Sequence, residues 1–296
     1  MTAFRNSSTA YVSSYLLLQC LNITPTIIVL NSRVRSTMEN KKKIFSIILV
    51  LAMVLGTVAL SGCTQETKNK IIVGTSADFA PFEYKLANQT IVGFDIDLIK
   101  KILTDEGYTV EVQDIGFDSL IPALQTGKID VIAAAMTIDD ERKQQVDFSI
   151  PYYDSNQTVL VKMGADVNIT TIEDLKNYTV GAQTGTTGWD WVNDTLVATG
   201  KLNSDKFRSY DLYTDAVADL IIGPSRVGAV VIDSPVAKAF VKSGNVKIVL
   251  NITTNESYGF AVEKGNTELA NKINAGLTAV MATTYWETLV EKYFAT

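Results

Sequence analysis

The sequence predicts a mixed α/β fold in which mostly parallel strands alternate with helices. From residue 71 onward, short β-branched runs alternate with segments whose apolar residues recur at helical spacing, and the same alternation occurs again after Tyr153. Such alternation favours a parallel sheet with helices packed on its faces. A chain of 296 residues can bury a substantial core without disulfides or metal ions.

In the first half of this region, the apolar run Ile71–Thr75 predicts a buried strand. Residues 93–106 carry most of their apolar side chains at helical spacing, and Gly107 is a natural stop for that helix. The next predicted elements are a strand at 108–112, a helix at 118–126, a strand at 129–134 and a helix at 139–145. Acidic residues in the first turn of the last helix complement its dipole.

The second half begins with a strand at 158–162 and an N-capped helix at 171–176. A strand at 178–182 leads into the loop Gln183–Gly188, and a helix, a strand and a helix follow. The last predicted elements are strands at 227–232, 246–250 and 258–262, and two helices within 266–294.

The composition excludes several classes of function. A net charge of −6 argues against nucleic-acid binding, which needs a basic surface. Histidine is absent, and the two cysteines, Cys20 and Cys63, precede the α/β region. The commonest general base and the usual zinc ligands are therefore missing there. We expect no cofactor, no metal site and no enzymatic activity.

The N-terminal residues predict export. Lys41–Lys43 form a basic segment, Ile44–Leu60 are mainly apolar, and small residues precede Cys63. Leu-Ser-Gly-Cys resembles a bacterial lipobox, which implies a signal peptide at 38–62, lipidation of Cys63 and a tether at 63–70. Residues 1–37 are then expected to be a gene-model extension before a start at Met38. The alternative is an uncleaved transmembrane anchor, since the apolar run approaches the length of a membrane span. Both interpretations place the α/β region outside the cytoplasm.

Polar residues follow several of the predicted strands. Ser76, Thr137, Thr186 and Asp233 each lie at or just after the carboxyl end of one of them. Ligands of open α/β sheets bind at this edge. The sequence therefore predicts a ligand site there.

An ordered series of motifs carries a resemblance to a known family. The motifs are GTSADFAPFEY, VGFDIDLIKKI, LIPALQTGKIDV, MTIDDERKQQVDFSIPYY, the GTT loop, VVIDSPV and SYGFAV. Over about residues 70–296 the chain resembles extracellular solute-binding protein family 3, the polar amino-acid receptors of ABC importers. This resemblance implies two Rossmann-like lobes with a two-strand hinge, the periplasmic binding protein-like type II fold. Lobe 1 is expected at 71–158 plus 258–296, and lobe 2 at 159–257.

The residues fit the chemistry of a free amino acid. Arg142 offers a carboxylate a planar pair of donors. The loop amides at Thr186 and Thr187 add donors at a helix start. Asp233 offers the ammonium group a carboxylate.

The resemblance adds further contacts. It implies that the main chain of Ala135 and the hydroxyl of Thr137 complete the two clamps, and that Phe79 and Phe117 enclose the ligand side chain. Asp95 is expected to cap a helix or to face solvent.

The identity of the ligand side chain depends on four residues. Ser76 stands where receptors for cationic amino acids often carry Asp, which weakens the case for Lys or His as ligand. Asp78 and Glu83 lie close by and could substitute for that Asp, so arginine stays open. Gln183 suits a polar neutral side chain, and the sequence favours glutamine.

The expected partners are a free polar amino acid, an ABC permease and, through the lipid anchor, the extracellular face of the cell membrane. The protein is expected to be a monomer and to bind no nucleic acid. Two alternatives stay open: a dehydratase of small acids that uses Glu83 or Asp233, and a sensory module that reports to a separate protein.

Overall fold

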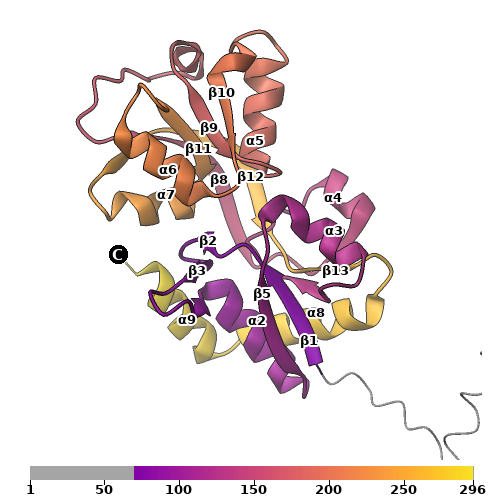
Figure 1. Cartoon of the computed structure of the whole chain (residues 1–296). Coiled ribbons are helices and arrows are strands. Elements are labelled where there is room, and N and C mark those ends of the chain that lie inside the picture. The colour runs from indigo at the N-terminus through magenta and orange to yellow at the C-terminus, as the bar shows by residue number, and fades with distance from the viewer. Residues whose placement is uncertain (1–69, 296) are drawn as a thin grey trace, which may run out of the picture. The chain divides into compact units, whose positions relative to one another are not determined.

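A computed structural model describes residues 70–295 (Figure 1). Its first sheet has five strands in the order β5-β1-β6-β13-β7. These strands are β5 (Thr109–Asp114), β1 (Lys70–Thr75), β6 (Val131–Ile132), β13 (Ala261–Glu263) and β7 (Val146–Phe148). β1 is parallel to β5 and β6, whereas β13 is antiparallel to β6 and β7.

Both faces of the first sheet are covered. The covering elements are α2 (Phe94–Asp105), α8 (Thr267–Met281) and α9 (Thr284–Phe294), and then η1 (Phe117–Ser119), α3 (Leu120–Gln125) and α4 (Asp140–Gln145). Val131 belongs to the cluster beneath α2 and α8, and its neighbour Ile132 belongs to the cluster beneath α3. Successive residues of a strand point to opposite faces, so an uninterrupted apolar run gives a sheet buried on both sides.

The second sheet also has five strands, in the order β10-β9-β11-β8-β12. They are β10 (Phe207–Tyr210), β9 (Val180–Gln183), β11 (Ala229–Asp233), β8 (Tyr153–Lys162) and β12 (Val246–Tyr258). Its helical segments are η2 (Ile172–Asn177), α5 (Thr187–Val192), η3 (Asn193–Val197), η4 (Ser204–Lys206), α6 (Tyr213–Ile222) and α7 (Ser234–Val241). α6 and α7 bury residues in one core cluster, and α5 and η3 bury theirs in another. The helix predicted at 171–176 is a 3-10 segment, opened by a capping box at Thr171.

Two long strands connect the two sheets. β8 and β12 run side by side between the lobes (Figure 1). They pair antiparallel from Val246↔Lys162 to Tyr258↔Tyr153, and Thr137 in the first lobe bridges to Tyr258. They form the predicted two-strand hinge of a two-lobed α/β fold. The strand predicted at 246–250 is longer in the structure, because β12 continues to Tyr258 with irregularities after Ile248 and Ile252. The strand predicted at 258–262 corresponds to β13, which begins only at Ala261.

A third, small sheet was not predicted. It consists of β2 (Asp78–Phe79), β3 (Glu83–Lys85) and β4 (Ile91–Val92). Gly93, with a φ of 143°, packs its backbone so tightly against β3 that a Cβ atom would lie 2.0 Å from the Phe82 carbonyl oxygen. This close approach, which only glycine permits, fixes the small sheet against the start of α2.

The predictions for residues 1–37, the signal peptide at 38–62, Cys63 and all of the tether but Lys70 lie outside the described residues. Within residues 70–295, no helix is both long and apolar enough to cross a membrane. The lobe boundaries placed at residues 158 and 258 fall inside β8 and at the end of β12.

Candidate functional site

A pocket lies where carboxyl ends of strands from both sheets meet. It is lined by all the residues predicted to contact a ligand, together with Asp78 and Glu83. The predicted residues are Ser76, Phe79, Phe117, Ala135, Thr137, Arg142, Gln183, Thr186, Thr187 and Asp233. The structure therefore brings them together, and their contact with a ligand stays a prediction.

Arg142 is the cation of this pocket, and its side chain joins the two lobes. Its Nη1 donates to the Thr137 carbonyl and its Nη2 donates to the Gly185 carbonyl, each at 3.0 Å. Nε lies 3.3 Å from the carboxylate of Asp139, which also caps the helix that carries Arg142. Since a guanidinium has five N–H groups, one remains on each terminal nitrogen. This pair suits the two oxygens of a carboxylate.

Asp233, at the end of β11, is a buried carboxyl with three hydrogen bonds. Its Oδ2 accepts from the Tyr258 hydroxyl at 2.5 Å and from Ser155 at 3.5 Å, and its Oδ1 accepts from the Gln157 amide at 3.0 Å. Burial, followed by the nearby charge of Glu256, raises the pKa of Asp233 to about 7. A cation bound beside Asp233 would restore its ionised form.

Glu83, at the start of β3, is fully buried and lines the pocket. Neither of its carboxylate oxygens has a hydrogen-bond partner in the structure. Burial raises its pKa well above the usual value, and the charges of Asp95, Asp78 and Asp233 raise it further. A buried carboxyl without partners is costly, so its place in a pocket favours a ligand that supplies donors.

Asp78 lies beside Glu83 and faces the second lobe. Its carboxylate accepts from the backbone N–H of Tyr213 at 2.6 Å and from the Ser76 hydroxyl at 3.1 Å. Burial, partly offset by these hydrogen bonds, raises its pKa to about 6. The ring of Phe79 packs on that of Tyr213, with centroids 5.5 Å apart. Both pocket aromatics thus have protein partners, since the ring of Phe117 lies 5.5 Å from the Arg142 guanidinium carbon.

The backbone of Ala135 is held by a buried acid. Ala135 has a φ of 45°, in the left-handed region that residues with a Cβ rarely adopt. Its N–H donates to Asp95 Oδ2 at 2.8 Å, and the Tyr152 hydroxyl donates to the same oxygen at 2.5 Å. The expectation that Asp95 caps a helix or faces solvent is wrong, because its side chain is buried and fixes a pocket-lining segment.

The side chains of Gln183 and Thr186 are already bonded within the second lobe. Gln183 donates its amide to the Asp211 carbonyl at 2.7 Å. The Thr186 hydroxyl accepts from the N–H of Trp189 at 3.1 Å, as the N-cap of α5, and donates to the Gln183 carbonyl at 2.7 Å. These bonds shape the start of α5, where Thr187 lines the pocket.

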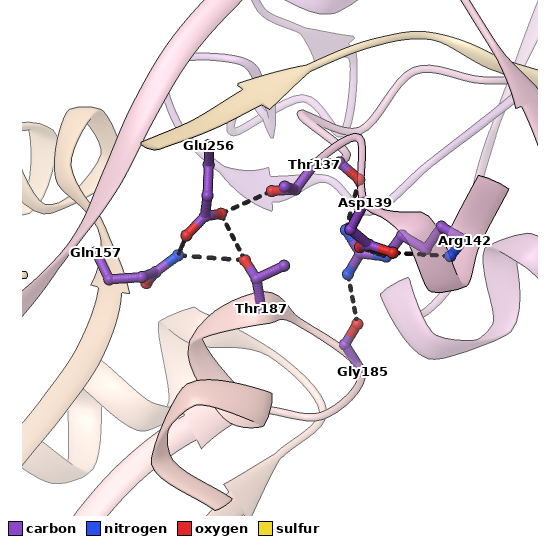
Figure 2. A network of polar contacts seen from close by, with 7 residues as sticks. All are labelled: Thr137, Asp139, Arg142, Gln157, Gly185, Thr187 and Glu256. Atoms are coloured by element: carbon purple, nitrogen blue, oxygen red, sulfur yellow. Dashed lines mark hydrogen bonds and ion pairs between the residues drawn. The ribbon is translucent and has the colours of Figure 1, made fainter. Parts of the chain in front are cut away.

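A polar network that the sequence analysis missed centres on Glu256 (Figure 2). Its carboxylate accepts from the hydroxyls of Thr137 and Thr187 at 2.8 and 2.6 Å, and from the Gln157 amide at 3.0 Å. Glu256 directly follows the polar run Thr-Thr-Asn, and nothing in that run predicts an inward-facing acid. Only the pairing of β12 with β8 brings it to the site.

Comparison with known proteins identifies the family. A family model described as bacterial extracellular solute-binding proteins, family 3, matches residues 71–296. The chain belongs to this family. Among residues 70–295 of this family 3 protein, no group of three or more His, Cys, Asp or Glu side chains could hold a metal ion.

Relatives of this family 3 protein carry more specific names. The arginine-binding extracellular protein ArtP of Bacillus subtilis is 35% identical over 256 residues, which cover 83% of this chain and 97% of that protein. A solved structure described as an ancestral arginine-binding protein bound to arginine is 42% identical, with a TM-score of 0.72, and covers 78% of this chain and 100% of its own. Another, described as an ancestral arginine-binding protein bound to glutamine, is 43% identical, with a TM-score of 0.71 and the same coverage.

Proposed function

We propose that this protein binds a free cationic amino acid, L-arginine, between its two lobes and delivers it to an ABC permease. The arginine-binding relatives and the charges of the pocket support arginine, and the family resemblance supports delivery to an importer. Export and lipid anchoring at Cys63 belong to the same proposal and rest on the sequence of residues 38–63 alone.

The charge balance of the pocket favours a cationic ligand. Three carboxyl groups, those of Asp78, Glu83 and Asp233, line it together with the single guanidinium of Arg142. Arginine brings one carboxylate for Arg142 and two cationic groups for the pocket carboxyls, and its guanidinium would be shared by two of those three. A neutral side chain such as that of glutamine would leave buried carboxyls without a cation, which is unfavourable in a desolvated site.

The single observation that carries the assignment is the fully buried Glu83 with two unpartnered oxygens. A guanidinium has several N–H donors in a planar fork that matches both oxygens of a carboxylate. When the guanidinium of the ligand arginine lies at Glu83 and Asp78, the α-ammonium group of the ligand would pair with Asp233. The carboxylate of the ligand would then take the two remaining N–H groups of Arg142.

A thermal-shift screen of the twenty amino acids, followed by calorimetry, tests the proposal. We expect arginine to raise the melting temperature most, because a ligand at 100 times its Kd stabilises the folded state by about 2.7 kcal/mol. Glutamine is the second candidate, since one solved relative is described as bound to it. A larger shift with glutamine would contradict arginine as the ligand, and no shift with any amino acid would contradict the receptor function.

Arginine binding is expected to release protons near neutral pH. The pKa values of Asp78 and Asp233 are raised to about 6 and about 7, and burial raises that of Glu83 as well. A bound cation favours the ionised form of each carboxyl, so arginine affinity should rise with pH across the interval from about 6 to 7. Calorimetry at pH 6.5 in buffers of different ionisation enthalpy measures this release. Equal affinity at pH 5.5 and pH 8 would contradict it.

The same carboxyl groups should make the protein without ligand less stable as the pH rises. A carboxyl whose pKa is raised by folding stabilises the folded state below its ordinary pKa near 4. That contribution is lost as the pH rises through 6 to 7, the raised values for Asp78 and Asp233. The melting-temperature increment given by arginine should therefore grow over this interval.

A further inference from the structure

We propose that Glu256 is a latch between the lobes: from the hinge strand β12 it holds Thr137 of the first lobe and Thr187 of the second. This role goes beyond ligand binding, because it concerns how far the lobes close on one another.

The contacts of the latch come from three separate segments. Oε2 of Glu256 accepts from Thr137 Oγ1 at 2.8 Å and from Thr187 Oγ1 at 2.6 Å, while Oε1 accepts from Gln157 Nε2 at 3.0 Å (Figure 2). Thr137 follows β6, Thr187 begins α5 and Gln157 lies in β8. All these atoms belong to the chain itself, so the hydrogen bonds of the latch need no ligand. With 8% of Glu256 exposed, they are largely shielded from water.

The hinge strand is shaped to present this side chain. The register of β12 against β8 shifts between Ile252 and Glu256, and Asn255 has a φ of 53°. In this irregular segment the N–H groups of Thr254 and Asn255 donate to Asn156 Oδ1 at 2.8 and 2.9 Å. Such irregularities re-aim a side chain, and here the side chain they aim is a buried acid.

The hydroxyl protons of Thr137 and Thr187 are both donated to Glu256 in the latch. A hydroxyl has one proton, and Thr137 and Thr187 each donate theirs to Glu256. Neither hydroxyl can then donate to a ligand carboxylate at the same time. The Thr137 oxygen is left as an acceptor, which suits an ammonium group and refines the role that the family resemblance implied for it.

The latch is also connected to the proposed ammonium partner. Gln157 Nε2 lies 3.0 Å from both Glu256 Oε1 and Asp233 Oδ1, so one amide group bridges the two carboxylates. A ligand ammonium at Asp233 would lie beside the latch, and release of the latch should therefore accelerate ligand dissociation.

The experiment measures the distance between the lobes by electron-spin resonance. Spin labels replace the exposed Lys128 and Lys201, one in each lobe, on the full-length chain with Cys20 and Cys63 changed to serine. Glu256→Gln keeps the shape but turns one acceptor into a donor, and Thr187→Val removes one hydroxyl. Glu173→Gln, at an exposed position, is the matched control.

Without ligand, we expect the wild type and Glu173→Gln to show a short-distance population that matches the arginine-saturated protein. Glu256→Gln and Thr187→Val should each lower it by at least half, and Glu256→Gln should raise koff for arginine about tenfold while kon changes less than twofold. Unchanged distances in both variants, or no short-distance population in the wild type, would overturn the latch. The distances report on closure even if arginine proves not to be the ligand, so failure of the proposed function is seen separately.

Discussion

Arg142→Ala is expected to weaken arginine binding by at least about 2–3 kcal/mol, a factor of roughly 30 to 150, the scale for removing the partner of a hydrogen-bonded charge. Arg142 is the only cation among the residues that line the pocket. It is 7% exposed, so water cannot replace it readily beside the ligand carboxylate. Its loss would also remove the hydrogen bond to Gly185, which joins the lobes.

Arg142→Lys separates charge from geometry. Lysine keeps the positive charge but lacks the planar fork, so it could not serve Thr137, Gly185 and a carboxylate together. We expect it to recover only part of the affinity lost in the alanine variant, as measured by calorimetry. Wild-type affinity in Arg142→Ala would show that the carboxylate binds elsewhere.

The strength of the sequence prediction varied with the length of the elements. Residues 93–106 were predicted as a helix and α2 spans Phe94–Asp105, because a dozen residues of apolar periodicity constrain both type and extent. The small sheet of β2, β3 and β4 was missed, since two or three residues carry no measurable period. β12 was predicted only as far as residue 250, because polar residues follow there, whereas its full length is fixed by tertiary pairing with β8.

The pocket residues were predictable where the family motifs fix their positions, as for Arg142 and Asp233. The partners of these residues were not. Asp95 and Glu256 contact residues 40 and 119 positions away, Ala135 and Thr137 respectively, through hydrogen bonds that only the folded chain creates. Local sequence carries propensity and capping signals but not such long-range pairing.

Glu83→Gln is expected to change the ligand preference of the pocket. The amide has the same shape, but it carries no charge and presents a donor to the donors of a guanidinium. Arginine affinity should fall by about 2 kcal/mol or more, roughly 30-fold, because truncating a buried charge pair leaves the ligand cation desolvated without its partner. Glutamine affinity should change less than about threefold. Calorimetry with both amino acids measures the ratio.

The unliganded protein provides an independent readout of the same substitution. Burial raises the pKa of Glu83 and so favours its uncharged form in the free protein. The uncharged amide should therefore leave the melting temperature of the free protein nearly unchanged while it weakens arginine binding. Glu173→Gln, at an exposed position, should alter neither quantity. Parallel losses of arginine and glutamine affinity in Glu83→Gln would instead mean that Glu83 supports the pocket without contacting the ligand side chain. An unchanged melting temperature joined to a selective loss of arginine affinity would mark Glu83 as an acid that contacts the ligand side chain.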